Sequence, residues 1–319
     1  MARESGTSEG SSSSSDNPTG GEITNLPNEL VTATESAIVH PNQSPLFHAE
    51  NSLRYDRQLL IRAYEKAYDC RLIVLFDNLL PYSVNIFEEL IFNADPNQDL
   101  HLLLCTPGGD GETAVRLVRS AQERCKEFTV IIPDLAKSAG TILALGAHHI
   151  QMGPTSDLGP IDPQLQVGQS GRLLVSAKDI IAAVEAAETA VQTKPETYAL
   201  HSALLADVTA LMVQQARSAL ARSEDIMREA LTSNPSRNDE DVAEMCVKLR
   251  EPLIDTPKSH GAILGKKDAE RMGLPITLAD PQSDQWQLIW RLWMKYWSTS
   301  QRIYEGSSVS KAIGPWNPQ

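Results

Sequence analysis

The chain is poor in cysteine and in basic residues. Its 319 residues include four cysteines. There are 28 lysines and arginines against 41 aspartates and glutamates, which gives a net charge of −13. The cysteines are scattered without Cys-x-x-Cys spacing, so we expect reduced thiols in a cytosol rather than disulfides or a metal site. With no basic stripe, the sequence also argues against nucleic acid as a partner and against binding to anionic membrane surfaces.

Other common features are absent as well. No apolar run approaches the roughly 18 residues that a membrane-spanning helix needs. The first residues lack the basic region followed by an apolar region that marks a secretory signal. The sequence therefore predicts a cytoplasmic chain with no transmembrane segment. No Gly-x-x-x-x-Gly-Lys-Ser/Thr motif occurs, so any use of ATP would belong to a separate chain, and we expect no cofactor.

The first half of the chain predicts a tail followed by an α/β domain. Residues 1–45 are rich in serine and acidic residues and poor in large apolar ones, so we expect this acidic tail to be disordered. From residue 46 onward, short apolar runs typical of strands alternate with helical patterns. This alternation predicts a mostly parallel sheet with crossover helices.

After residue 164 the sequence becomes largely helical. We expect a helix over 177–192, a break at Lys194-Pro195, and a longer helix over 196–232 that either packs on the core or protrudes as a helical arm. In the C-terminal segment 281–319, tryptophans recur at helical spacing, and the last dozen residues are expected to be loose. The stripe predicts a helix packed on its own domain, a partner groove or an interfacial membrane helix; its members are Trp286, Trp290, Trp293 and Trp297.

Three motifs between residues 102 and 164 carry the chemistry. Thr106-Pro107-Gly108-Gly109 follows the apolar run Leu102-Leu103-Leu104, and two glycines at a strand end allow close backbone approach with N–H groups pointing outward. Ser138, in Lys137-Ser138-Ala139-Gly140-Thr141, lies between a strand and an apolar helical run. A helix N-terminus favours negative charge, so a nucleophile whose reaction develops an oxyanion would be placed there. The third motif is Leu158-Gly159-Pro160-Ile161-Asp162-Pro163-Gln164.

In this order and spacing, the three motifs resemble those of the Clp-fold serine proteases, and most closely the serine dehydrogenase proteinase family. The resemblance runs from about residue 53 to residue 278 and is densest over 102–164. It implies a Clp/crotonase-like α/β fold for residues 46–280. It also implies a serine peptidase that acts on peptide or protein substrates as a homo-oligomer.

The resemblance also suggests the catalytic residues. The histidine of the Clp proteolytic subunit has no counterpart after Ser138, where the chain reads Pro160-Ile161-Asp162. The order described for the serine dehydrogenase proteinase family is Ser, Asp, His, which here gives Ser138 as nucleophile, His260 as base and Asp162 as the residue that orients the histidine. The oxyanion would be bound by the backbone N–H groups of Gly109 and Ala139, together with Gly108.

Several alternatives stay open at this point. Asp157 competes with Asp162, and His101 with His260. Signal peptide peptidases, which share the wider fold, pair their serine with a lysine, so Lys178 or Lys137 could serve as the base. The fold is also compatible with a non-catalytic scaffold. An acyl-CoA enzyme is the last alternative, although no basic cluster for the CoA phosphates lies near the motifs.

Overall fold

The computed structural model describes residues 44–167, 173–257, 259 and 261–316. The predicted tail therefore lies outside the described residues, apart from its last two positions at the start of helix α2. That helix spans Pro45–Tyr68. Ser44 caps it by accepting a hydrogen bond from the N–H of Phe47, and Pro45 occupies its first turn.

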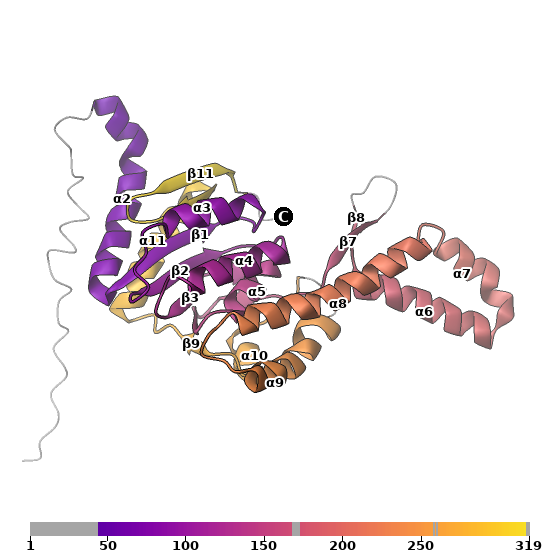
Figure 1. The fold of residues 1–319 in the computed structure, drawn as a ribbon. Helices are drawn as coiled ribbons and strands as arrows, with labels where there is room; N and C mark the ends of the chain where they lie inside the picture. The colour runs from indigo at the N-terminus through magenta and orange to yellow at the C-terminus, as the bar shows by residue number, and fades with distance from the viewer. Residues whose placement is uncertain (1–43, 168–172, 258, 260, 317–319) are drawn as a thin grey trace, which may run out of the picture.

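A mostly parallel seven-stranded sheet forms the centre of the molecule, as the sequence predicts (Figure 1). Its order is β11-β10-β1-β2-β3-β5-β9. The five strands from β1 to β9 run parallel, and β10 and β11 add an antiparallel edge. The bounds are β1 (Cys70–Phe76), β2 (Asp99–Cys105), β3 (Phe128–Ile132), β5 (His149–Met152), β9 (Ile276–Leu278), β10 (Gln301–Glu305) and β11 (Ser310–Pro315).

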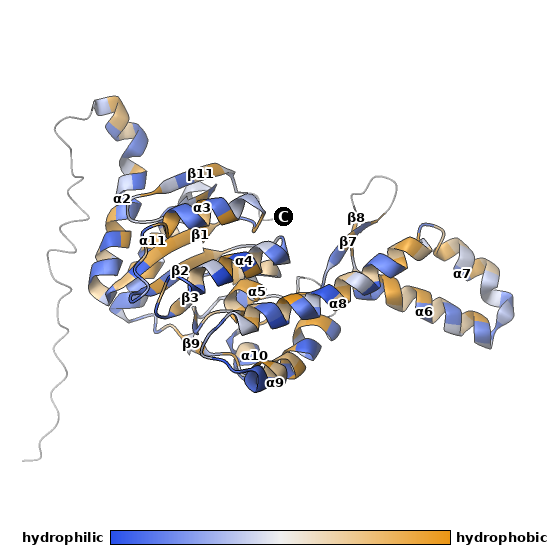
Figure 2. Cartoon of the chain, viewed as in Figure 1, coloured by the Kyte–Doolittle hydropathy of each residue, from blue (hydrophilic) through white to orange (hydrophobic). Residues whose placement is uncertain are grey.

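Helices cover both faces of this sheet, which explains why its central strands are apolar along most of their length (Figure 2). On one face, Ile73 and Leu75 of β1 lie in a core with α3 (Tyr82–Leu90), α4 (Gly111–Gln122), α5 (Ala139–Leu145), α8 (Ala210–Thr232) and α9 (Asp239–Arg250). On the other face, the alternate residues Leu72 and Val74 pack with α2 and α11 (Asp284–Thr299). The molecule is thus a three-layer α/β/α structure.

The C-terminal segment is part of the sheet rather than a loose tail. Strand β10 pairs with β1, and β11 pairs with β10, so the expectation for the last dozen residues is wrong for 310–315. A buried ion pair holds this edge: Arg57 of α2 donates to Glu305 of β10 at 2.6 and 3.2 Å, and Tyr296 of α11 donates to the same carboxylate at 2.6 Å. This one carboxylate ties α2, near the start of the described chain, to the consecutive elements α11 and β10 near its end.

An arm extends from the body of the molecule (Figure 1). The hairpin of β7 (Gln164–Val167) and β8 (Leu173–Ser176) leads to α6 (Ala177–Thr193), a 3₁₀ turn (Pro195–Thr197) and α7 (Tyr198–Leu204), after which α8 returns to the body. The single helix expected over 196–232 is therefore wrong. Thr209 starts a new helix by accepting the N–H of Met212 with its side chain. The reversal lets α8 pack on α6 through Ile180 and Ala216.

Candidate active site

The three motifs meet where β2 and β3 end. A small sheet pairs β4 (Leu135–Ala136) with β6 (Asp157–Leu158), and isolated bridges add Thr106 beside Ala136 and Leu264 beside Leu158. The Pro-Gly-Gly turn follows Thr106, Ser138 follows β4, and Asp162 follows β6. Backbone pairing thus places segments from three separate parts of the sequence side by side.

Ser138 has a strained backbone. Among the described residues other than glycine, only Asp69, Ser138 and Ser300 have a positive φ. Asp69 and Ser300 are left-handed helix C-caps, whereas Ser138 has φ 49° and ψ −111° immediately before α5. Such sparsely populated conformations cost about 1–3 kcal/mol and gather at functional sites. The half-buried Ser138 hydroxyl makes no hydrogen bond within the described part of the chain.

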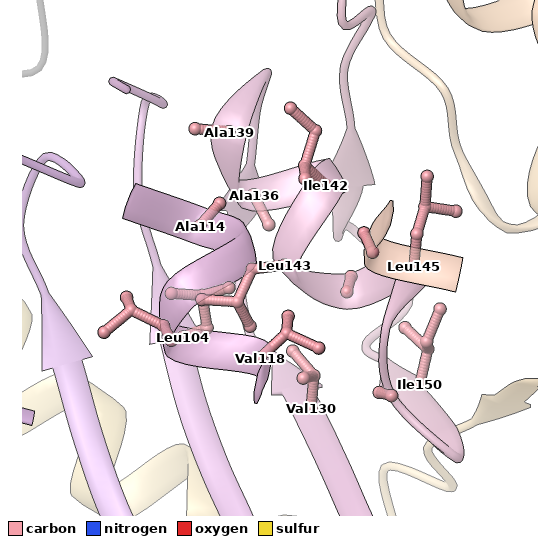
Figure 3. Close-up of a cluster of buried hydrophobic side chains, with 14 of the residues drawn as sticks. Leu104, Ala114, Val118, Val130, Ala136, Ala139, Ile142, Leu143, Leu145 and Ile150 are labelled. Atoms are coloured by element: carbon pink, nitrogen blue, oxygen red, sulfur yellow. The ribbon is translucent and has the colours of Figure 1, made fainter. Parts of the chain in front are cut away.

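The core beneath Ser138 explains why α5 can start there. Ala139, Ile142, Leu143 and Leu145 of α5 are buried against Leu104 of β2 and Val130 of β3, with Val118 of α4 closing the cluster (Figure 3). The small residues at 139 and 140 bring the start of the helix close to the Thr106 turn. A Cβ at Gly140 would lie 2.4 Å from Cγ2 of Thr106, which excludes any larger residue there.

The two motif glycines are required by close packing. A Cβ at Gly108 (φ 119°) would lie 2.9 Å from the Cβ of Ser138, and a Cβ at Gly109 (φ 145°) would lie 2.1 Å from the Leu79 carbonyl oxygen. The Gly108 N–H donates to Oγ1 of Thr106 at 3.1 Å. Within the described residues, the N–H groups of Gly109 and Ala139 donate to no acceptor. These two backbone donors, one in the Pro-Gly-Gly turn and one at the start of α5, thus have no partner among the described residues.

Lys137, which precedes Ser138, acts as a structural tie. Its ammonium donates to Oδ2 of Asp157 at 2.7 Å, to the Leu158 carbonyl at 3.1 Å and to the Ala262 carbonyl at 3.1 Å. A lysine ammonium has three N–H donors, so all are occupied. The sequence suggests Lys137 as a possible base and Asp157 as a competitor of Asp162, but it does not reveal that the two residues pair. It leaves Lys137 without a lone pair for Ser138 and assigns Asp157 to Lys137.

Asp162 lies in a buried stretch with 1% of its surface exposed. The preceding Ile161 donates its N–H to the Leu253 carbonyl at 2.9 Å, and the carbonyl of the following Pro163 accepts from the Ala177 N–H at 2.9 Å. Thr141, three residues after Ser138, accepts the Gly159 N–H at 3.0 Å through its hydroxyl. These bonds fix the Asp162 loop against the segment that carries Ser138.

His260 lies outside the described residues, so its place in the triad stays a prediction. The chain on its C-terminal side is held near the nucleophile. Ala262 accepts the hydrogen bond from Lys137, and Leu264 pairs with Leu158 through two backbone bonds, of 2.9 and 3.1 Å.

The other candidate bases have different partners. Among the described residues, no hydrogen bond joins the Lys178 ammonium to the Ser138 hydroxyl. Lys178 instead donates to the carbonyls of Ile254 and Pro257. His101 lies near the start of β2, whereas the motif turn follows the end of that strand. Its ring is bonded to the Tyr64 hydroxyl of α2 at 2.9 Å. Burial lowers the pKa of His101 to about 4.

Across the described residues, none of the helices combines the length and apolar character needed to cross a membrane. Within the same residues, no three His, Cys, Asp or Glu side chains gather as a potential metal site.

Several known proteins are similar to parts of this chain. Two uncharacterized proteins of Methanocaldococcus jannaschii match: one is 38% identical over 72 residues, 23% of this chain and 25% of that protein. The other is 26% identical over 150 residues, 47% of this chain and 44% of that protein. The chain thus spans less than half the length of the curated relatives it matches.

Among solved structures, a mutant of a membrane-bound stomatin-specific protease shares 25% identity with a TM-score of 0.28, covering 34% of this chain and 57% of that chain. The family model of ClpP-like SDH-type serine proteinases matches residues 86–283, which is more than half of the chain and includes all three motifs. The chain therefore belongs to the family of ClpP-like SDH-type serine proteinases.

Proposed function

We propose that this chain is a serine peptidase that cleaves peptide bonds through an acyl-enzyme on Ser138. The observation that carries the proposal is the strained Ser138, placed between β4 and α5 against the Gly108 turn. A nucleophile on a sharp, strained strand-to-helix turn is held with its hydroxyl exposed to substrate. Family membership supports peptide or protein substrates.

The proposed reaction has two halves. Oγ of Ser138 attacks the carbonyl carbon of the scissile bond while His260 takes the hydroxyl proton, and the carbonyl oxygen becomes an oxyanion. The C–N bond then breaks, and the leaving amine takes the proton from His260. His260 deprotonates a water molecule, which attacks the ester carbonyl. His260 then returns this proton to Oγ of Ser138 as the C–O bond breaks and the carboxylic acid product leaves. Asp162 orients the histidine and stabilises its protonated form.

The oxyanion hole in this proposal consists of the N–H groups of Gly109 and Ala139. Both belong to segments in contact with Ser138, and neither donates to a described acceptor. The N–H of Gly108 is already bonded to Thr106, so it is not an oxyanion donor in this proposal. Gly108 instead lets the turn lie close to Ser138, because it has no Cβ. Preorganised donors of this kind typically contribute ~10²–10³ in rate each.

Self-association is proposed from the arm. Its residues Tyr198, Leu200, Leu204 and Leu211 are exposed although they are large and apolar, and exposed apolar patches of this kind mark interaction sites. We infer that copies of the chain associate through the arm as a homo-oligomer, which light scattering of the purified chain measures; a monomer at micromolar concentration would contradict it.

A fluorophosphonate probe tests the proposed function directly. Such probes form a covalent bond with an activated serine, so the wild-type chain is expected to be labelled and the Ser138→Ala variant is not. Labelling is read by in-gel fluorescence, with heat-denatured wild type as a control for non-specific reaction. Equal labelling of both proteins, or none of either, would contradict the proposal.

A further inference from the structure

A small aromatic pocket lies beside the strand that leads to Ser138. One stripe of α11, formed by Trp290, Trp293, Met294 and Trp297, faces Pro133, Asp134 and Thr155 around a cavity of about 220 Å³. Trp293 is buried at 4% exposure and packs edge-on against Phe76, so it anchors the helix. Trp290 and Trp297 are 41% and 60% exposed. Trp290 stacks on Trp286, and both Trp290 and Trp297 line the pocket while remaining partly exposed.

Asp134 gives this pocket a negative group without a cationic partner. No described residue forms an ion pair or hydrogen bond with its carboxylate. The cation that acts on it is Lys137, whose three N–H donors are already used by Asp157, Leu158 and Ala262. Burial, and next the charge of Asp157, raise the pKa of Asp134 above its usual value. The positive charge of an incoming cation would act in the opposite direction to both effects and favour the ionised carboxylate.

We propose that this pocket binds the side chain of a lysine or arginine from a polypeptide. Indole faces attract cations through their quadrupoles, and tryptophan is the strongest of the aromatic residues in this respect. The Asp134 carboxylate adds a charge-assisted hydrogen bond to the ammonium or guanidinium. Among the described residues, the cation–π pairs of the chain itself are Arg54 with Tyr55 and Arg57 with Tyr296, so the indoles of the pocket are not occupied by the chain's own cations.

The size of the pocket restricts the ligand to one side chain. Sites for small molecules typically have volumes of about 300–1,000 Å³, larger than this cavity. The net charge of −13 favours the approach of a basic polypeptide.

The pocket lies close enough to Ser138 to act on the same polypeptide. Asp134 precedes Ser138 by four residues, and four residues span at most about 14 Å. If the proposed peptidase activity is correct, a basic residue held here would position a substrate a few residues from the cleaved bond. This second step rests on the proposed function, whereas binding of the cation does not.

Fluorine NMR of the full chain tests the pocket without relying on activity. The Ser138→Ala protein is labelled with 5-fluorotryptophan, and the signals of Trp290 and Trp297 are assigned with Trp290→Phe and Trp297→Phe. Titration with Nα-acetyl-arginine methylamide and with Nα-acetyl-lysine methylamide is expected to shift these two signals in a saturable way. Nα-acetyl-citrulline methylamide, which is neutral and nearly the same shape as the arginine compound, is expected to leave them in place.

Two variants with the same change of charge separate the pocket from general electrostatics. Asp134→Asn is expected to weaken binding by about three- to tenfold, the loss that follows from removing one partly desolvated charge contact. Asp207→Asn, in the exposed loop before α8, is expected to leave the affinity unchanged. The proposal is overturned by equal shifts with the citrulline compound, by unshifted signals at tens of millimolar ligand, or by unchanged affinity in a folded Asp134→Asn protein. If the wild-type chain proves to have no peptidase activity, the binding measured by NMR is not affected. The proposed pocket and the proposed peptidase function can therefore fail separately.

Discussion

Replacing Ser138 with alanine is expected to lower kcat for peptide hydrolysis by at least about 10⁴-fold, because no covalent intermediate can then form. The fold should be preserved. Alanine keeps the Cβ that contacts Gly108 and has the same difficulty with a φ of 49°, so the strain is unchanged. The measurement is the initial rate of cleavage of an unstructured protein substrate, with thermal unfolding as the check on folding.

Two control variants separate the hydroxyl from its backbone. Ser138→Gly removes the Cβ, and glycine adopts the positive φ readily. This variant should therefore be at least as stable as wild type and as inactive as Ser138→Ala. Ser298→Ala, which removes an exposed hydroxyl on α11, should keep full activity. A Ser138→Ala protein that retains more than a few per cent of the wild-type rate would exclude Ser138 as the nucleophile.

Replacing His260 with alanine is expected to reduce kcat about as severely as the loss of Ser138, because members of one catalytic unit act together. Wild-type activity should rise with pH through one ionisation near the histidine reference value of about 6.5, since only neutral imidazole accepts the serine proton. Rates of peptide cleavage between pH 5 and pH 9 give the profile. A rise only at alkaline pH would indicate a lysine base instead.

Lys178→Arg distinguishes the two candidate bases. Arginine can replace the hydrogen bonds from Lys178 to the carbonyls of Ile254 and Pro257, but it stays protonated and cannot act as a base. We expect this variant to retain most of its activity. If Lys178→Arg is inactive and His260→Ala is active, the triad assignment is wrong and a Ser138–Lys178 dyad takes its place.

The architecture could be predicted because its signals are local. The apolar runs that become β1, β2 and β3 are buried on both faces, and runs of that kind are typical of parallel strands. The start of α8 at Thr209 was not predicted, because neither glycine nor proline marks the reversal and the cap is a single threonine side chain. Pairing of β10 with β1 joins residues more than 200 positions apart, which no local pattern reveals.

The sequence shows the motif residues around Ser138 but not the contacts that they make. The glycines at 108, 109 and 140 are visible in the sequence, yet only the structure shows that each faces Ser138, Leu79 or Thr106 too closely for a Cβ. Lys137 was a candidate base on adjacency alone. The structure shows that Lys137 makes three bonds to residues distant in the sequence, one of them to Ala262. Its role there is to hold the segment of Ser138 against the chain that follows position 260.

The central claim is that peptide hydrolysis passes through an ester on Ser138, and a quenched acylation experiment tests it most directly. The wild-type chain is mixed with N-acetylated amino acid p-nitrophenyl esters, quenched in acid within milliseconds, and analysed by intact mass and by tryptic mapping. We predict the mass of one acyl group on the peptide that begins at Ser138 after cleavage at Lys137. Rapid release of p-nitrophenol with no adduct at any time, or an adduct on a different residue, would contradict the account.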